Sequence, residues 1–403
     1  MKKDGHIMRG DLDAILAEKR VEALLLYSES FKNANMYYLT KFLAPDPFIF
    51  LKKADADPMV VTSIMEYPRA QKESIIKDVR CYTDYNYMQV MKAAEEPQLG
   101  AMKFIATVAK KELNKKTKIC VPQNFPTMAT DVLREEGLTI QPMFDVVEKA
   151  REIKDPDEID EIKAVQEVAE KVTAEVIDLI ANAEVDTKGT LIVKKEPLTV
   201  NRIKSFFGHH FIDHGCAMEE ELIVACGPKG ADPHYHGDPQ DKLKANQPII
   251  FDIYPRSLRR RYWTDMTRTI VKGKAPDKVK KMFDAVLEAK NASVDALRAG
   301  VLGTEIYDLC CDVLEKAGYK TIRGGKQIMK GLIHSLGHGV GLDIHEGPGM
   351  NELYKFPLKE HNILTVEPGL YDPSIGGVRI EDIVEVKKGG CNNLTKMEIR
   401  LEV

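Results

Sequence analysis

Three histidines and a glutamate gather in one short, glycine-rich stretch, GLIHSLGHGVGLDIHEGP, at residues 331–348. The histidines are His334, His338 and His345, and Glu346 directly follows the last of them. Histidine is a frequent metal ligand and the usual carrier of protons near neutral pH. The stretch therefore predicts metal binding or acid–base chemistry, and a complete site needs carboxylates from elsewhere in the chain.

Four acids stand inside apolar segments that the sequence predicts as strands. They are Asp252 in PIIFDIY, Asp265 in YWTDMTRTIV, Glu367 in ILTVEPGLY and Glu381 in VRIEDIVEV. Burying an ionised carboxylate is costly unless a cation compensates it, and a single case usually reflects an ion pair or an exposed position. Four such acids beside a histidine motif indicate one shared metal centre.

The ligand types narrow the choice of metal. Oxygen-rich ligation with one imidazole suits Mn²⁺, Co²⁺, Fe²⁺ or Zn²⁺ rather than a thiophilic ion, and we expect Mn²⁺ first. Four carboxylates are more than one divalent ion needs. Two divalent ions bridged by carboxylates and a hydroxide are therefore the preferred hypothesis.

The domain that must position these acids is predicted to begin at residue 152. Asp155, Pro156 and Glu158 form a helix start with an N-cap, a proline and a capping box, and apolar residues then recur every three or four positions up to Ile180. Helices are also expected at about 276–299 and 304–317, with strands around each acid. Each half of residues 152–403 thus offers carboxylate-bearing strands and helices, which suggests a two-fold pseudo-repeat. Residues 186–205 fit no helical pattern.

Residues 1–151 are predicted to form a smaller α/β domain. Short apolar runs at 22–28, 47–53, 58–64 and 118–123 predict strands, and 99–113 and 127–137 predict helices. Neither of the common nucleotide-binding fingerprints occurs in it. We assign this domain no chemistry.

Composition limits the partners and the compartment. A length of 403 residues predicts two domains, and a net charge of -4 gives no electrostatic case for nucleic acid. No apolar run approaches the roughly 20 residues that cross a membrane, and MKKDGHIMRGDLD lacks the apolar core of a signal peptide. The seven cysteines are scattered and lack CxxC spacing, which favours reduced thiols in the cytoplasm.

The ordered motifs DIY, WTDMTRT, HSLGHGVGLDIHEGP, TVEPGLY and GGVRIED resemble those of the pita-bread metallopeptidases, specifically the Xaa-Pro peptidases. The resemblance covers the whole chain. It implies an α/β two-domain fold, with a creatinase-type N-terminal domain at 1–151 and a pita-bread catalytic domain at 152–403. It also implies a metallo-exopeptidase and homodimer that cleaves dipeptides or short peptides before proline. Dipeptidase and aminopeptidase activity both stay open.

Carried over residue by residue, the resemblance implies five metal ligands, of which Asp265 and Glu381 bridge two ions. The five are Asp252, Asp265, His338, Glu367 and Glu381. Glu367 would handle the proton of a bridging hydroxide that attacks the peptide carbonyl. The remaining implied site residues contact the substrate or stabilise the oxyanion, and they are His234, His345 and Arg379.

Other polar residues near the motifs receive weaker interpretations. We expect His334 to support or pack against the site, and His236 is an alternative to His234. Tyr371 is expected to hydrogen-bond near the site, and residues 259–261, three arginines, to form a solvated turn. His209 and His210 are expected in loops or interfaces rather than as ligands. Thr267 and Thr269 are expected to support the site residues or to pack.

One departure from the family pattern concerns the turn between the two aspartates. Asp252 and Asp265 are thirteen positions apart, two more than is usual for the family. Two extra residues preserve side-chain parity on paired strands, so both aspartates should still face the same side.

Three other functions compete with Xaa-Pro cleavage. A methionine aminopeptidase would share the ligands but normally lacks the first domain. A creatinase-like C–N hydrolase and a non-catalytic interaction homologue would have no need of five intact ligands.

Overall fold

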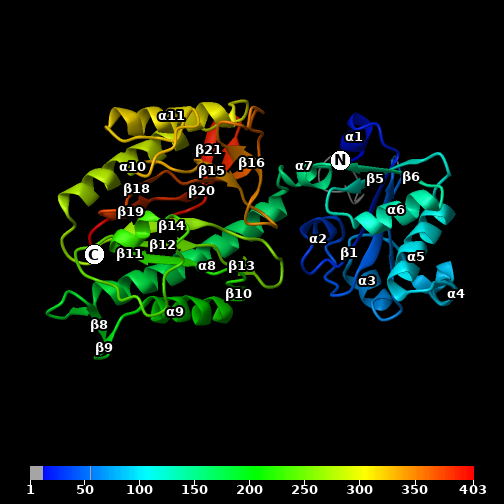
Figure 1. The fold of residues 1–403 in the computed structure, drawn as a ribbon, viewed down its shortest axis with the longest axis horizontal. Helices are drawn as coiled ribbons and strands as arrows, with labels where there is room; N and C mark the ends of the chain where they lie inside the picture. Colours follow the sequence, from blue (N-terminus) through cyan, green and yellow to red (C-terminus); the bar gives the residue numbers. More distant parts are fainter. Residues whose placement is uncertain (1–11, 55) are drawn as a thin grey trace. The chain divides into compact units, whose positions relative to one another are not determined.

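The structure is a computed structural model that describes residues 12–54 and 56–403. The N-terminal residues on which the signal-peptide prediction rests therefore lie mostly outside the described residues. The chain divides into two compact units, Met1–Arg151 and Glu152–Val403 (Figure 1). No helix in the described ranges is both long and apolar enough to cross a membrane.

The first unit is built on a six-stranded mixed sheet with the strand order β4-β3-β2-β1-β5-β6. The pairs β1/β2 and β2/β3 are antiparallel, and the other three are parallel. The strands are β1 (Ala23–Ser28), β2 (Phe48–Lys53), β3 (Met59–Thr62), β4 (Asp78–Cys81), β5 (Lys118–Pro122) and β6 (Thr139–Met143). The four predicted strands are confirmed. The two missed strands, β4 and β6, are the sheet's edges, and their partly exposed side chains give little apolar signal.

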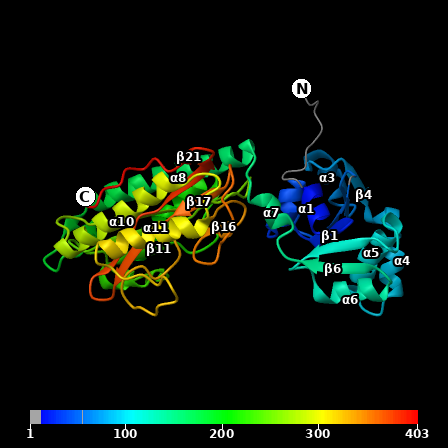
Figure 2. The same ribbon diagram turned by 90° about the horizontal axis from the view of Figure 1, so that it is seen from above.

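Helices cover this sheet and supply its core. Phe104, Ile105 and Val108 of α5 pack with Leu25 and Ile49 of the sheet, and Figure 2 shows α5 and α6 beside β6. The helices of this unit are α1 (Leu12–Glu18), α2 (Ala34–Thr40), α3 (Tyr67–Glu73), η1 (Tyr82–Tyr85), α4 (Tyr87–Ala93), α5 (Pro97–Glu112), α6 (Thr127–Glu135) and α7 (Val147–Arg151). The two predicted helices correspond to α5 and α6.

The second unit has two pairs of long helices. The first pair is α8 (Pro156–Ala181) and α9 (Val200–Asp213), and the second is α10 (Asp277–Ala296) and α11 (Gly303–Lys316), which lie side by side in Figures 1 and 2. The predicted capping box starts α8, where the Glu158 carboxylate accepts from the backbone N–H of Asp155 at 3.0 Å. Gly318 closes α11 with a φ of 88°, a value that glycine adopts without strain.

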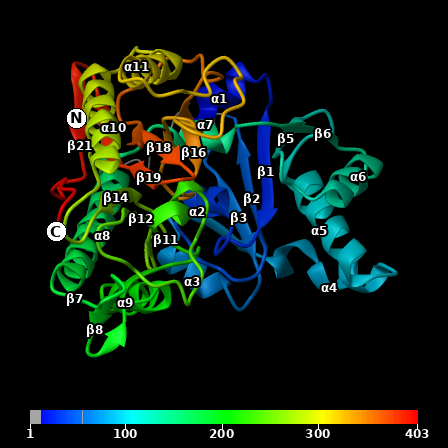
Figure 3. The same ribbon diagram turned by 60° about the vertical axis from the view of Figure 1, so that its left-hand side comes forward.

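Between the helix pairs lie antiparallel sheets whose strands contain or flank the four acids (Figure 1). A three-stranded sheet has the order β11-β12-β14, a five-stranded sheet β16-β15-β17-β20-β21, and β18 pairs with β19. In Figure 3, β18 and β19 of the second half lie beside β12 and β14 of the first. The strands are β11 (Ile223–Cys226), β12 (Ile249–Ile253), β14 (Met266–Ile270), β15 (Gly337–Gly339), β16 (Glu346–Met350), β17 (Ile363–Val366), β18 (Gly369–Asp372), β19 (Gly376–Arg379), β20 (Asp382–Lys387) and β21 (Gly390–Asn393).

The segment without a sequence prediction, 186–205, combines part of a small sheet with the start of a helix. It holds two of the three strands β7 (Glu184–Val185), β8 (Leu191–Val193) and β9 (Glu196–Pro197), and then α9 begins. The turn before β9 places Lys194 and Lys195 at φ values of 54° and 66°. Because these strands are so short, no period-2 pattern can develop in the sequence.

Two local predictions in this unit need comment. His209 and His210 lie in the helix α9 rather than in a loop, and the alternative that they belong to an interface stays a prediction. The arginine run 259–261 is not uniformly solvated, because Arg261 is only 2% exposed and forms an ion pair with Glu219 at 2.7 Å. The same segment follows the short pair β10 (Cys216–Ala217) and β13 (Arg256–Ser257). The longer turn is thus partly an interior element of the fold.

Candidate metal centre and active site

A cavity of about 570 Å³ in the second unit brings together every residue to which the sequence assigned a site role. Its walls also include His236, His334 and Tyr254. The assigned residues on its wall are His234, Asp252, Asp265, His338, His345, Glu367, Arg379 and Glu381. Residues from both halves of the unit therefore face one space.

Of the four acids, one lies within a strand and three lie just beyond the end of a strand. Asp252 lies within β12, as predicted. The prediction is wrong for the other three: Asp265 precedes β14, Glu367 follows β17, and Glu381 occupies the break between β19 and β20. At such ends the backbone leaves the ladder, which allows side chains from different sheets to converge.

The register of β12 and β14 explains how the longer turn is accommodated. Asp252 is paired directly with Thr267. Asp265 lies two positions before Thr267, and side chains two positions apart on extended backbone share a face. The two aspartates consequently face the same cavity despite the extra residues.

Asp265, His338 and Glu381 form the tightest group. Each offers a ligand atom, and these atoms lie within 4.8 Å of one another. The His338 Nε2 atom is 3.7 Å from Asp265 Oδ2 and 3.4 Å from Glu367 Oε1. One imidazole and two carboxylates thus lie at the spacing of ligands around one divalent ion, and Glu367 lies beside the imidazole.

Two threonines orient these carboxylates. The Thr267 hydroxyl lies 2.9 Å from Asp252 Oδ1 and 2.7 Å from Glu381 Oε2. Thr365 Oγ1 accepts from the His338 backbone N–H at 3.0 Å and donates to Glu367 Oε1 at 3.3 Å. Thr267 therefore links carboxylates from the two halves, which is a support role of the kind expected from the sequence.

All three guanidinium nitrogens of Arg379 form hydrogen bonds to other side chains of the protein. Its Nε donates to Thr267 Oγ1 at 3.0 Å, its Nη1 to the Tyr371 hydroxyl at 3.0 Å, and its Nη2 to Asp252. The Tyr371 oxygen also lies 2.9 Å from Nε2 of His334, whose Nδ1 lies 2.7 Å from the Ser335 carbonyl. A neutral His334 with its proton on Nδ1 fits both contacts, since Tyr371 then donates to Nε2.

The remaining histidines lie on the cavity wall. The rings of His338 and His345 are in edge contact, 4.3 Å apart between centroids. The turn that carries His234 is held by the Asp232 carboxylate, which accepts from the His234 backbone N–H at 3.0 Å.

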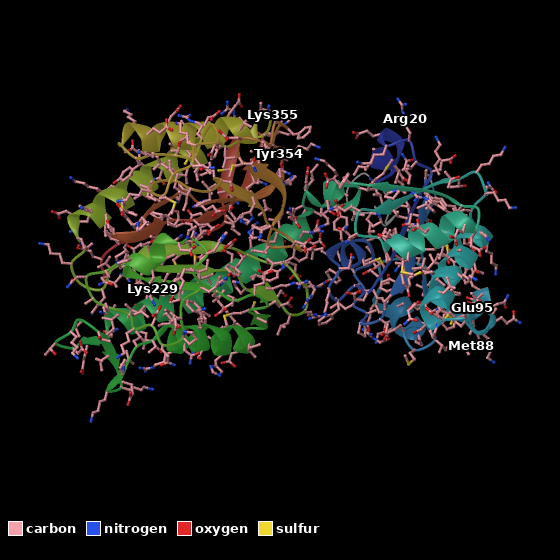
Figure 4. All side chains as sticks on the ribbon, in the orientation of Figure 1. Arg20, Met88, Glu95, Lys229, Tyr354 and Lys355 are labelled. Atoms are coloured by element: carbon pink, nitrogen blue, oxygen red, sulfur yellow. The ribbon has the colours of Figure 1, made fainter. Side chains whose placement is uncertain are left out.

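A second set of bonds ties down the turn around His234. The Tyr235 hydroxyl and Lys229 Nζ both bond to Asp241, at 2.6 and 2.5 Å, and Lys229 is labelled in Figure 4. His236 instead turns its Nδ1 to the Glu221 carbonyl at 2.7 Å. That bond leaves only one ring nitrogen of His236 for a substrate.

Comparison with known proteins identifies the family. Residues 160–388 match the model of metallopeptidase family M24, and residues 9–153 match the creatinase/prolidase N-terminal domain. The chain belongs to metallopeptidase family M24. The predicted fold, a creatinase-type domain followed by a pita-bread domain, is thereby confirmed, and this M24 protein is a metallopeptidase.

Individual relatives of this M24 protein are Xaa-Pro peptidases by name. The Xaa-Pro dipeptidase of Pyrococcus furiosus is 33% identical over 258 residues, which cover 64% of this chain and 67% of that one. The prolidase from Pyrococcus horikoshii OT3 matches in structure with a TM-score of 0.75 and 25% identity, covering 97% and 98% of the two chains. The X-Pro aminopeptidase from Thermotoga maritima MSB8 shares the fold, with a TM-score of 0.76, 23% identity and coverage of 96% and 99%.

The chemistry of the cavity fits the divalent metal ions that the M24 family implies. Asp265 Oδ1 is buried and has no hydrogen-bond partner within the described part of the chain. A buried carboxylate oxygen without a donor is costly, and a metal ion would satisfy it. The donor set around it, carboxylate oxygens with one imidazole, is the set that Mn²⁺ and similar ions accept.

Without a cation, the carboxylates of this centre resist ionisation. Burial, followed by repulsion from neighbouring carboxylates, raises the pKa of Asp265 and Glu381 well above the usual range. Burial also raises the pKa of Glu367, to about 8. Burial lowers the pKa of His338 to about 4 and that of His334 to about 3, so both imidazoles are neutral near pH 7. Neutral imidazole is the form that binds a metal.

These pKa shifts predict that the metal-free protein loses stability as pH rises from 6.5 to 8. The two histidines, with lowered folded-state pKa values, cost stability only below about pH 6.5, their unfolded value. The three carboxyl groups have raised pKa values, so stability is fully present below about pH 4.5 and is lost as pH rises through those values. We expect the melting temperature of EDTA-treated protein to fall by roughly 5 °C over this interval in calorimetry.

Saturating Mn²⁺ should remove that pH dependence, because bound metal keeps the carboxylates deprotonated. A metal-free melting temperature that is constant or rises between pH 6.5 and 8 would contradict the prediction.

The sequence analysis did not predict several residues in and around the site. Lys154 contacts Glu346, the neighbour of His345, at 2.6 Å. The Tyr254 hydroxyl, beside the cavity, donates to the Glu221 carbonyl at 2.5 Å. Thr365 was overlooked because a threonine in a strand is ordinary. A sequence signal exists only for Thr365, since it stands two positions before Glu367 and shares its face.

Proposed function

We propose that this M24 metallopeptidase hydrolyses the peptide bond before proline in dipeptides or short peptides, using two divalent metal ions, with Mn²⁺ first. The proposed ligands are Asp252, Asp265, His338, Glu367 and Glu381. The observation that carries the proposal is the single cavity lined by these five residues together with His234, His345 and Arg379. The name of the Pyrococcus furiosus relative supports the preference for proline.

The metal ions would lower the pKa of a bound water and polarise the peptide carbonyl, so they would supply the nucleophile and part of the oxyanion stabilisation. Asp265, His338 and Glu381, whose ligand atoms lie within 4.8 Å of one another, would hold the ions together with Asp252 and Glu367.

The protein's own groups handle protons and orient the substrate. Glu367 accepts the proton of the attacking water and passes it to the departing proline nitrogen, a role open to a carboxylate on the cavity wall. His345, in contact with His338, donates to the oxyanion, and His234 contacts the substrate from the opposite half.

Arg379 positions other site residues, in addition to the contact with substrate or oxyanion that the resemblance implies. Because its nitrogens already bond to Thr267, Tyr371 and Asp252, it orients Asp252 and the Tyr371 hydroxyl. A proline nitrogen has no N–H to recognise, so selection for proline must rely on the shape of the cavity.

A metal-reconstituted assay tests the proposal. The EDTA-treated protein is expected to be inactive on Gly-Pro, and added Mn²⁺ or Co²⁺ is expected to restore cleavage. A Gly-Ala substrate serves as the control for proline preference, and a Met-Xaa peptide tests the methionine aminopeptidase alternative. If neither metal restores cleavage of any Xaa-Pro substrate, the proposed function is wrong.

A longer peptide separates the two Xaa-Pro activities. Cleavage of Gly-Pro alone identifies a dipeptidase, whereas cleavage of an Xaa-Pro-Xaa peptide identifies an aminopeptidase. The compared proteins include one named as a dipeptidase and one named as an aminopeptidase.

We also propose that the enzyme works in the cytoplasm as a homodimer. Its seven cysteines are all free thiols, as suits a reducing compartment. Sedimentation equilibrium of the full chain tests the dimer, and a single species at the 45.3 kDa monomer mass would contradict it.

A further inference from the structure

Three charged residues lie buried beside Glu381 but outside the cavity wall. They are Arg268 of β14, Lys290 of α10 and Asp382 at the start of β20, which are 2%, 4% and 1% exposed. The Asp382 carboxylate accepts from Arg268 Nη2 at 2.9 Å, from Lys290 Nζ and from Asn393 Nδ2 at 2.8 Å. We call Arg268, Lys290 and Asp382 the buried triad.

Arg268 also donates hydrogen bonds to backbone carbonyls next to the proposed metal centre. Its Nη1 donates to the Glu381 carbonyl at 2.6 Å and to the Thr267 carbonyl at 3.0 Å, and its Nη2 donates to the Met397 carbonyl at 3.0 Å. The Thr267 carbonyl in turn accepts from the Glu381 N–H at 3.1 Å. The N–H and the carbonyl of Glu381 are therefore both held from β14.

Glu381 needs such support because no sheet ladder reaches it. The pairing of β18 with β19 ends at Arg379, and the pairing of β17 with β20 begins at Asp382. In a regular strand, ladder bonds fix the direction of each side chain. At this break the guanidinium of Arg268 fixes the backbone of Glu381 instead. The Thr267 hydroxyl holds the carboxylate itself, 2.7 Å from Glu381 Oε2.

The other two members of the triad hold Arg268 in place. A buried guanidinium needs a counter-ion, which Asp382 provides. Lys290 bonds to the second Asp382 oxygen and so ties this arrangement to α10. Rotation of Asp382 away from Arg268 would break several of these bonds at once.

We propose that the buried triad is a positioning device that sets the Glu381 carboxylate relative to Asp265 and thereby determines how tightly the centre holds metal. This inference rests on the proposed function, because it takes Glu381 to be a metal ligand. Residues that hold ligands from outside a metal site typically contribute about 10–100-fold to metal affinity.

Arg268→Lys tests the proposal. Lysine keeps the positive charge beside Asp382 but lacks the planar fork that reaches three carbonyls. Titration calorimetry of Mn²⁺ into the metal-free full chain is expected to show affinity about 10–100-fold weaker than that of the wild type. At saturating Mn²⁺ the KM for Gly-Pro should stay unchanged, because none of the triad lines the cavity.

Arg256→Lys is the matched control. Arg256 is likewise buried, at 8% exposure, and it bonds to a carboxylate, that of Glu219, and to a backbone carbonyl, that of Arg261. It makes no bond to a proposed ligand. We expect this variant to lose thermal stability and to keep the wild-type Mn²⁺ affinity.

Lys290→Gln covers the case in which circular dichroism shows that Arg268→Lys does not fold. Glutamine can still donate to Asp382, and we expect Mn²⁺ binding weakened severalfold. Wild-type Mn²⁺ affinity in Arg268→Lys, or in Lys290→Gln when the first variant does not fold, overturns the proposal. Wild-type protein that binds neither Mn²⁺ nor Co²⁺ instead overturns the proposed function, so the two failures are distinct.

Discussion

Asp265→Asn is expected to lower kcat/KM on Gly-Pro by at least about 1,000-fold at saturating Mn²⁺. The substitution replaces one carboxylate oxygen by an amide nitrogen and removes a negative charge from the proposed bridging position. Loss of a principal group that stabilises the transition state costs on this scale. Steady-state kinetics over a range of Mn²⁺ concentrations measures the effect, and excess metal should not restore activity.

The same variant is expected to be more stable than the wild type when both are metal-free. Burial and the repulsion of Glu381, Asp252 and Glu367 raise the pKa of Asp265, so the neutral amide avoids the free-energy cost of keeping this carboxyl group protonated above pH 7. A higher melting temperature in EDTA combined with lost activity separates ligand loss from misfolding. Asp308→Asn, on the exposed side of α11, controls for the chemical change. Activity within tenfold of the wild type in Asp265→Asn would contradict the ligand assignment.

Much of this site could be predicted because its signals are local in the sequence. An acid within or beside an apolar strand stands out without knowledge of the fold, as Asp252 and Glu381 do. The spacing of Asp265 from Asp252 also predicted a shared face, and the register of β12 with β14 places both on the same side. What the pattern could not show is that Glu381 sits in a break between strands, because both flanking strands are equally apolar.

Contacts between distant residues were the features that the sequence did not reveal. Thr267 joins carboxylates from both halves, and it bonds to Glu381 across 114 positions. Lys154 bonds to Glu346 across 192 positions. A threonine in a strand and a lysine before a helix are common on exposed surfaces. Only folding shows that these two lie inside, where one hydrogen bond or ion pair has a large effect.

The ion pair of Lys154 with Glu346 supports the stretch that carries His345. Lys154 Nζ lies 2.6 Å from Glu346 Oε1, and the two side chains are 2% and 7% exposed. The backbone folds closely around this carboxylate, because a Cβ on Gly341 would lie 2.4 Å from Glu346 Oε1. The Asp343 N–H donates to the other oxygen at 3.3 Å. The stretch that carries His345 is thus tied by an ion pair to a residue far away in the sequence.

Lys154→Met should therefore lower the free energy of unfolding by about 3–5 kcal/mol, the usual effect of removing one partner from a buried ion pair. Methionine keeps most of the aliphatic chain, so the loss reports the charge rather than the volume. Urea denaturation monitored by circular dichroism measures it. The double variant Lys154→Met/Glu346→Gln should recover part of the loss, because the remaining side chain is no longer charged. A loss below about 1 kcal/mol in the single variant, as for an exposed pair, would show that the fold holds His345 without this ion pair.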